Sequence, residues 1–216
     1  MEKAKQLLRK TGSASRAGKQ KSNIFKTEDQ PYQLPVEVDL PPPRPPPSKN
    51  PPRLLSVGAG SRGYAFARAI VHGSNGFVAA VADPVAARRK RLGKHHIWGI
   101  DEPKEGQEFS GWREFLEWER QRRTRVKKGE EGHDIPEAID GVVICTLDQT
   151  HAEIVEGLAP LNLHILCEKP LATTLDDCLR IYRTVQTVEE KKLFGVGHSV
   201  KYAPRSTLLK KASAGG

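Results

Sequence analysis

The feature that most constrains the fold is a glycine-rich turn between a short apolar run and a stretch of helical character. Residues 53–60 read RLLSVGAG, and Gly58, Gly60 and Gly63 have the spacing G-x-G-x-x-G. Gly58 permits a tight turn, Gly60 lets the backbone approach a pyrophosphate, and Gly63 allows close helix–strand packing. The next helix would offer unpaired N–H groups to the phosphates. This strand–turn–helix context is what dinucleotide binding requires. The alternative is a glycine turn without a ligand.

Further apolar runs follow, separated by stretches that predict helices. Continuous apolar runs are typical of strands buried on both faces, as in parallel sheets. Alternating strands and helices therefore predict an α/β fold with a doubly wound, mostly parallel sheet of the Rossmann type. The further runs are Phe77–Pro84, Gly141–Thr146, His164–Pro170 and Lys192–Ser199, and the helical stretches are Arg62–His72, Pro84–Lys94, Trp112–Arg125, Gln149–Leu161 and Thr174–Lys191.

Three details of these helices can be predicted. Pro84 is expected in a first turn, where its missing N–H is harmless. Thr174 followed by Asp177 resembles a capping box. The charged stretch 119–134 lacks an apolar face and is expected to be a solvated helix extension and loop; binding to an acidic partner is the alternative.

Polar residues follow two of the apolar runs at the expected carboxyl edge of the sheet. Asp83 lies 20 residues after Gly63, where an acid accepts hydrogen bonds from ribose hydroxyls and disfavours a 2′-phosphate, so NAD is favoured over NADP. A helix cap is the alternative role for Asp83. Thr146 can bind ribose or phosphate. His151 falls in the first turn of a helix, where it is either a cofactor contact or a structural histidine.

The fourth apolar run ends in Glu168-Lys169-Pro170 at the same expected edge. Glu168 could therefore meet Thr146 and the glycine turn in one crevice. Lys169 could supply a cation near the nicotinamide ribose and a substrate oxygen, because desolvation can lower a lysine pKa towards neutrality. The alternative is a surface ion pair between Glu168 and Lys169 at a strand end.

Together these motifs resemble the glucose-fructose oxidoreductase / inositol dehydrogenase / MocA family. VGAGSRG, ADP, the stretch 146–151, CEKPLA and GHSVKYAP follow in the family's order. The resemblance implies hydride transfer between NAD or NADP and a sugar, cyclitol or related polyol. It also implies that Lys169 helps to position cofactor and substrate and assists proton transfer, whereas Lys201 stands where the family has an arginine. The predicted cofactor-binding residues are Gly58, Gly60, Ser61, Arg62, Gly63, Asp83, Thr146, His151, Glu168 and Lys169, with Lys169 also the predicted catalytic residue.

Family members continue into a second α/β domain that carries most substrate contacts. We expect residues 53–204 to form the dinucleotide-binding domain and 205–216 to be the start of the second domain, which is not complete here. Three interpretations follow: a truncated oxidoreductase whose chain is inactive alone, a non-catalytic dinucleotide-binding regulatory or scaffold module, or an enzyme completed by another subunit.

The first 52 residues differ in composition from the rest. Residues 1–26 hold eight lysines and arginines against Glu2 alone, a large part of the net charge of +9. We expect a disordered basic tail and, over 40–53, a polyproline II linker that could act as a spacer or dock an SH3 or WW domain. The lysines lack interleaved aromatics, so nucleic acid is not the expected partner.

The cysteines and the lengths of the apolar runs indicate the compartment in which the chain is expected to function. None of the three cysteines forms a C-x-x-C pair, which predicts a reducing compartment such as the cytoplasm and no zinc site. No apolar run approaches the roughly 20 residues that span a bilayer, so no membrane partner is expected.

Overall fold

The computed structural model describes residues 46, 48–130, 135–188 and 192–199, with single positions 206, 209, 210 and 213. The predictions for the basic tail, for half of the proline-rich linker, for Lys201 and for most of 205–216 lie outside these residues. Among the described helices, none is both long and apolar enough to cross a bilayer.

Six parallel strands form one sheet in the order β3-β2-β1-β4-β5-β6, as predicted for a doubly wound fold. From β1 the sheet extends in one direction through β2 and β3 and in the other through β4, β5 and β6, so the strand order reverses between β1 and β4. These two strands pair side by side although they are far apart in the chain. The strands are β1 (Arg53–Val57), β2 (Phe77–Ala82), β3 (Glu108–Phe109), β4 (Gly141–Ile144), β5 (His164–Glu168) and β6 (Phe194–Gly197).

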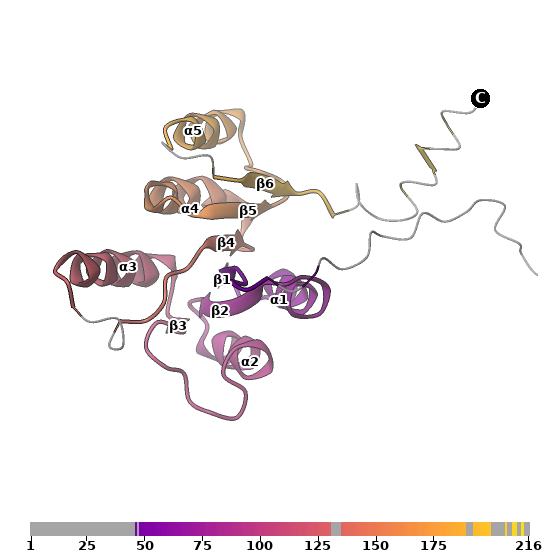
Figure 1. Ribbon diagram of the computed structural model, residues 1–216. Coiled ribbons are helices and arrows are strands. Elements are labelled where there is room, and N and C mark those ends of the chain that lie inside the picture. The colour runs from indigo at the N-terminus through magenta and orange to yellow at the C-terminus, as the bar shows by residue number, and fades with distance from the viewer. Residues whose placement is uncertain are drawn as a thin grey trace, which may run out of the picture. The chain divides into compact units, whose positions relative to one another are not determined.

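Helices cover both faces of this sheet (Figure 1). On one face α1 and α2 pack through Ala67 and Leu92, and on the other α3, α4 and α5 pack through residues such as Phe115, Leu158 and Ile181. The helices are α1 (Ser61–Gly73), α2 (Ala86–His96), α3 (Trp112–Lys127), α4 (His151–Leu158) and α5 (Leu175–Gln186), with 3-10 turns η1 (Asp148–Thr150) and η2 (Ala159–Leu161).

The helix details predicted from the sequence have different outcomes. The cap of α5 is confirmed, because the Thr174 hydroxyl oxygen accepts the N–H of Asp177 at 3.1 Å. Pro84 does not lie in the first turn of α2: the helix begins at Ala86, after Val85 at the N-cap. Thus Pro84 belongs to the connection that leaves β2.

The charged part of α3 is more buried than its sequence predicts. Glu119 is fully buried. Its carboxylate pairs with Arg122 and Arg123, each through Nε at 2.7 Å. Arg123 also donates to the carbonyl of Leu161 at 2.5 Å. Because the buried acid is paired with two guanidinium groups, α3 can pack a polar side chain inward; residues 131–134 lie outside the described residues.

Candidate nucleotide-binding crevice

The glycine turn is held between the ends of β2 and β4, where the strand order reverses. Gly58 donates its N–H to the carbonyl of Ala82 at 2.8 Å, and Cys145 donates to the carbonyl of Val57 at 2.7 Å. Gly58 has φ of +93°, and a Cβ there would lie 2.5 Å from the Cys145 carbonyl oxygen. A Cβ on Gly63 would lie 1.9 Å from the carbonyl oxygen of Gly58. Packing of the turn itself therefore requires glycine at positions 58 and 63.

Gly60 differs from the other two glycines of the motif, Gly58 and Gly63, because the fold itself does not require glycine at position 60. Its φ is −70°, which any residue can adopt. A Cβ at this position would meet no atom of the described chain within 4 Å. Gly60 is the N-cap of α1, and no side chain of the described residues caps this helix end. The open space beside unpaired helical N–H groups fits the pyrophosphate of a dinucleotide.

Ser61 and Arg62 form the exposed start of α1. The Arg62 guanidinium reaches across to β5, where its Nε donates to Oε1 of Glu168 at 2.7 Å and its Nη2 contacts the same oxygen. Glu168 is only 5% exposed, so this contact compensates a buried charge. The structure thus joins two of the predicted site residues that are far apart in the sequence.

The alternative of a surface ion pair between Glu168 and Lys169 is wrong. The second carboxylate oxygen of Glu168 accepts the backbone N–H of Lys169 at 2.6 Å, not its ammonium group. The Lys169 side chain is exposed and has no acidic partner among the residues that the structure describes. Glu168 therefore connects the start of α1 to the backbone of Lys169.

Asp83 lies at the end of β2 and is 4% exposed. Its Oδ2 accepts the N–H of Ala59 at 2.7 Å, and its Oδ1 accepts the N–H of Val85 at 2.8 Å. The carboxylate thereby ties the glycine turn to the N-cap of α2. Each carboxylate oxygen keeps a further acceptor site. Asp83 consequently has a structural role in addition to the predicted contact with ribose.

Thr146 and His151 flank the exit from β4. The Thr150 hydroxyl lies 2.8 Å from the hydroxyl oxygen of Thr146. His151 begins α4 and so lies in the first turn of the helix, as predicted, and it is fully buried. Its Nδ1 lies 3.0 Å from the carbonyl oxygen of Pro170, which makes Nδ1 the donor. This contact favours a structural role, in which His151 holds the segment that follows Lys169.

The cysteines near the crevice do not supply a nucleophile. Burial, and then the charge of Glu168, raises the pKa of both Cys145 and Cys167 to about 12. Both thiols are therefore neutral at physiological pH. No group of three or more His, Cys, Asp or Glu side chains within the described ranges could hold a metal ion.

Three residues at this edge were not singled out from the sequence. Leu147, three residues after the end of β4, is 67% exposed, and Val85, at the N-cap of α2, is 42% exposed. A Cβ on Gly197, at the end of β6, would lie 3.4 Å from the Cα of Glu168. Leu147 and Val85 are apolar residues in the connections that follow β4 and β2, and this position in the sequence is the signal that could have identified them.

Comparison with known proteins supports the same domain. The model of the Gfo/Idh/MocA oxidoreductase family, described as an NAD-binding Rossmann fold, matches residues 53–198. The rhizopine catabolism protein MocA of Rhizobium meliloti is 34% identical over 127 residues, which cover 58% of this chain and 31% of that protein. An inositol 2-dehydrogenase of Paracoccus denitrificans is 37% identical over 76 residues, which cover 35% of this chain and 22% of the relative.

Solved structures share the fold at lower identity. Myo-inositol 2-dehydrogenase from Lactobacillus plantarum superposes with a TM-score of 0.60 at 17% identity, over 77% of this chain and 42% of that chain. Scyllo-inositol dehydrogenase from Lactobacillus casei, solved with bound NAD(H) and scyllo-inositol, gives a TM-score of 0.58 at 16% identity, over 77% of this chain and 42% of that chain. The chain thus spans under a third of these two curated relatives and less than half of these two solved chains.

Proposed function

Because the chain belongs to the oxidoreductase family with an NAD-binding Rossmann fold, we propose that its crevice at the carboxyl edge of the sheet holds NAD. The observation that carries this proposal is Gly60, a glycine with ordinary φ whose Cβ would meet nothing in the described chain. A side chain there would enter the space in which this proposal places the pyrophosphate. The N–H groups at the start of α1 and the Arg62 guanidinium are the phosphate donors in this proposal.

The remaining predicted residues have distinct roles in the proposal. Asp83 fixes the turn and offers its free acceptor sites to the adenosine ribose, which favours NAD over NADP. Thr146 offers its hydroxyl to ribose or phosphate. His151 supports the crevice indirectly, through the Pro170 carbonyl. We propose that residues 53–204 constitute this nucleotide-binding domain and that 205–216 begin a second domain.

We also propose that the whole protein oxidises or reduces a polyol, sugar or cyclitol. Bound NAD+ would accept the hydride in the oxidation, and bound NADH would supply it in the reduction. Lys169 is the group suited to the accompanying proton, since its ammonium is exposed at the crevice and has no acidic partner among the described residues. In the proposed reduction its ammonium group would donate a proton to the substrate oxygen, and in the proposed oxidation its neutral amine would accept the proton of the substrate hydroxyl. The three free cysteines favour a reducing compartment, for which we propose the cytoplasm.

The test is a calorimetric titration of the 216-residue chain with NADH, repeated for Gly60→Val and Gly73→Val. Gly73 ends α1, and a Cβ there likewise meets nothing within 4 Å, so it is a matched control. We expect NADH binding by the parent chain and by Gly73→Val, and loss of binding in Gly60→Val with an unchanged circular dichroism spectrum. Equal affinity of all three proteins for NADH would contradict the proposal.

A further inference from the structure

Helix α5 carries a second apolar face that the described chain leaves open. Its inner face packs into the core through Ile181, which is 1% exposed. Its outer face has Leu175 at 73%, Leu179 at 39% and Tyr182 at 62% exposure. These three residues are spaced i, i+4 and i+7, so they form one continuous stripe along the helix. We call this surface of Leu175, Leu179 and Tyr182 the outer stripe.

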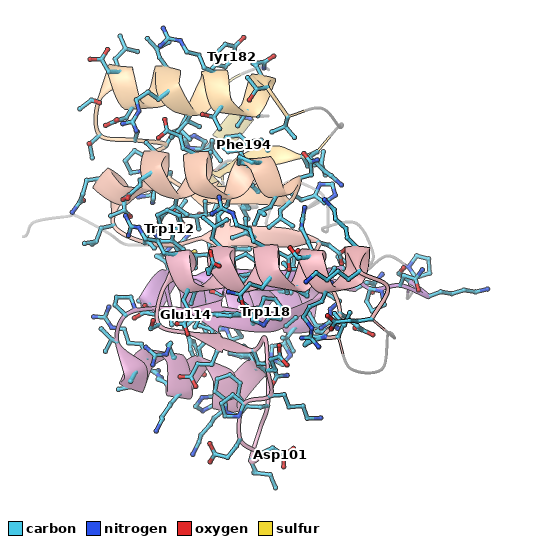
Figure 2. All side chains as sticks on the ribbon, turned by 90° about the vertical axis from the view of Figure 1, so that its left-hand side faces the viewer. Asp101, Trp112, Glu114, Trp118, Tyr182 and Phe194 are labelled. Atoms are coloured by element: carbon cyan, nitrogen blue, oxygen red, sulfur yellow. The ribbon has the colours of Figure 1, made fainter. Side chains whose placement is uncertain are left out.

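The outer stripe lies at the end of a layer. Helices α3, α4 and α5 line one face of the sheet in that order, and β6 is the edge strand (Figure 1). Tyr182 lies on the side of α5 that is turned away from α4 (Figure 2). No helix or strand of the described ranges lies beyond α5 on this side. An apolar stripe in such a place is typical of an interaction surface.

The charged residues of α5 differ in whether they form ion pairs within the described chain. On the side towards α4, Arg180 forms ion pairs with Asp177 at 2.6 Å and with Glu156 at 2.5 Å. Beside the stripe, Asp176 and Arg183 are exposed, and neither forms an ion pair with another described residue. They are seven residues apart, so they lie on the same flank about 10.5 Å from one another along the helix axis.

We propose that the outer stripe is the interface with a second copy of this chain, in which the two α5 helices pack antiparallel about a two-fold axis near Leu179. Such an isologous interface requires that a surface be complementary to itself. Under this axis Leu175 lies close to Tyr182 of the partner subunit, because the two positions are four and three residues from Leu179 and so differ by about 1.5 Å along the helix. The same operation brings Asp176 beside Arg183 of the partner subunit on the same flank.

This self-complementarity is what favours a second copy over an unrelated partner. The apolar pair and the charged pair have the same spacing of seven residues, and their midpoints lie half a residue on either side of Leu179. One axis at Leu179 therefore brings both pairs to within about 1.5 Å of exact register along the helix. Each copy therefore contributes one acid and one base, giving two equivalent ion pairs across the interface. The contact is short, so we expect a weak and concentration-dependent dimer.

The test is sedimentation velocity on the 216-residue chain from about 1 µM to about 1 mM, a range that covers weak association. We expect a monomer–dimer equilibrium whose dissociation constant rises at least about tenfold in Leu179→Glu and in Leu175→Glu. Leu175 is the second variant because it is the more exposed and tolerates a charge without disturbing the core. Val126→Glu is the matched control, since Val126 is an apolar residue of α3 with 51% exposure; it should dimerise like the parent.

Reversal of the charges tests the antiparallel geometry. We expect Asp176→Arg and Arg183→Asp each to weaken the dimer several-fold, and the double variant to restore it, while circular dichroism confirms that all variants fold. A parent chain that stays monomeric over the whole range would overturn the proposal and leave the stripe to a different protein. Dimers unaffected by Leu179→Glu and Leu175→Glu, or a double charge variant as weak as the singles, would also overturn it.

Discussion

Two buried carboxylates, Asp83 and Glu168, bind groups from distant parts of the chain at the crevice. Asp83 accepts two backbone N–H groups, and Glu168 binds the Arg62 guanidinium and the N–H of Lys169. The position of Asp83 could be predicted because it follows the glycine turn at a regular distance. The contact between Arg62 and Glu168 could not, since the two residues are separated by 106 positions and no local pattern relates them.

The role of Asp83 in the turn leads to a prediction about stability. Asp83→Asn leaves either the Ala59 or the Val85 N–H facing an amide NH2 group, because the asparagine amide has only one oxygen to accept both. We expect a loss of about 1–3 kcal/mol in the free energy of unfolding, measured by urea denaturation. Asp101→Asn, at an exposed loop position, is the control, and its free energy of unfolding should change little.

If Asp83 also binds ribose, Asp83→Ala should reduce the preference for NADH over NADPH.

The pair formed by Arg62 and Glu168 predicts a non-additive double-mutant cycle. Arg62→Leu leaves the Glu168 carboxylate, which is 5% exposed, without its charged partner. We therefore expect a loss of about 2 kcal/mol in the free energy of unfolding. Adding Glu168→Gln should recover most of that loss, because the buried charge is then absent. Arg68→Leu, an exposed position on the same helix, is the control. Strictly additive effects of the two changes would show that the pair does not contribute to stability.

At the scale of elements, long apolar runs were reliable guides and short or polar segments were not. The five runs predicted as strands correspond to β1, β2, β4, β5 and β6. β3 has only two residues, Glu108 and Phe109, and no sequence period can be recognised over that length. The burial of Glu119 on α3 was missed for another reason: its charge is compensated by Arg122 and Arg123, which a pattern of apolar residues does not reveal.

The start of α3 predicts a dependence of stability on pH. Ser110 donates its hydroxyl and its N–H to Glu114 at 2.6 and 2.5 Å, and these hydrogen bonds hold the pKa of Glu114 below its ordinary value of 4.5. A lowered folded-state pKa contributes stability that is fully present above 4.5 and is lost as the pH falls through the folded pKa. The difference in stability between the parent and Ser110→Ala should therefore shrink on acidification.

Urea denaturation of the parent and Ser110→Ala between pH 7 and pH 3 measures this dependence. Thr124→Ala, which removes a hydroxyl from the far end of the same helix and involves no carboxylate, should show a difference that does not depend on pH. A Ser110→Ala difference that is constant with pH would mean that the Glu114 carboxylate gains nothing from Ser110.

At the scale of the whole molecule, the strand order, the reversal between β1 and β4 and the glycine turn together define one edge of the sheet. Gly58–Gly63, Asp83, Thr146 and Glu168 all lie at that edge, because parallel strands end on the same side. The family predicted from the motifs is confirmed by the match over residues 53–198. The chain's own sequence could not identify a substrate, since the residues that match the family are those of its nucleotide-binding domain.

The most direct test of the account is a map of amide chemical-shift changes in the 15N-labelled chain during titration with NAD. The amides of Ala59, Gly60, Ser61 and Lys169 should shift as NAD binds along the carboxyl edge. The amides of Asp140 and Asn162, which precede β4 and β5 at the opposite edge, should stay unchanged. Absence of any shift, or shifts confined to residues outside the crevice, would contradict the claim that this edge binds the dinucleotide.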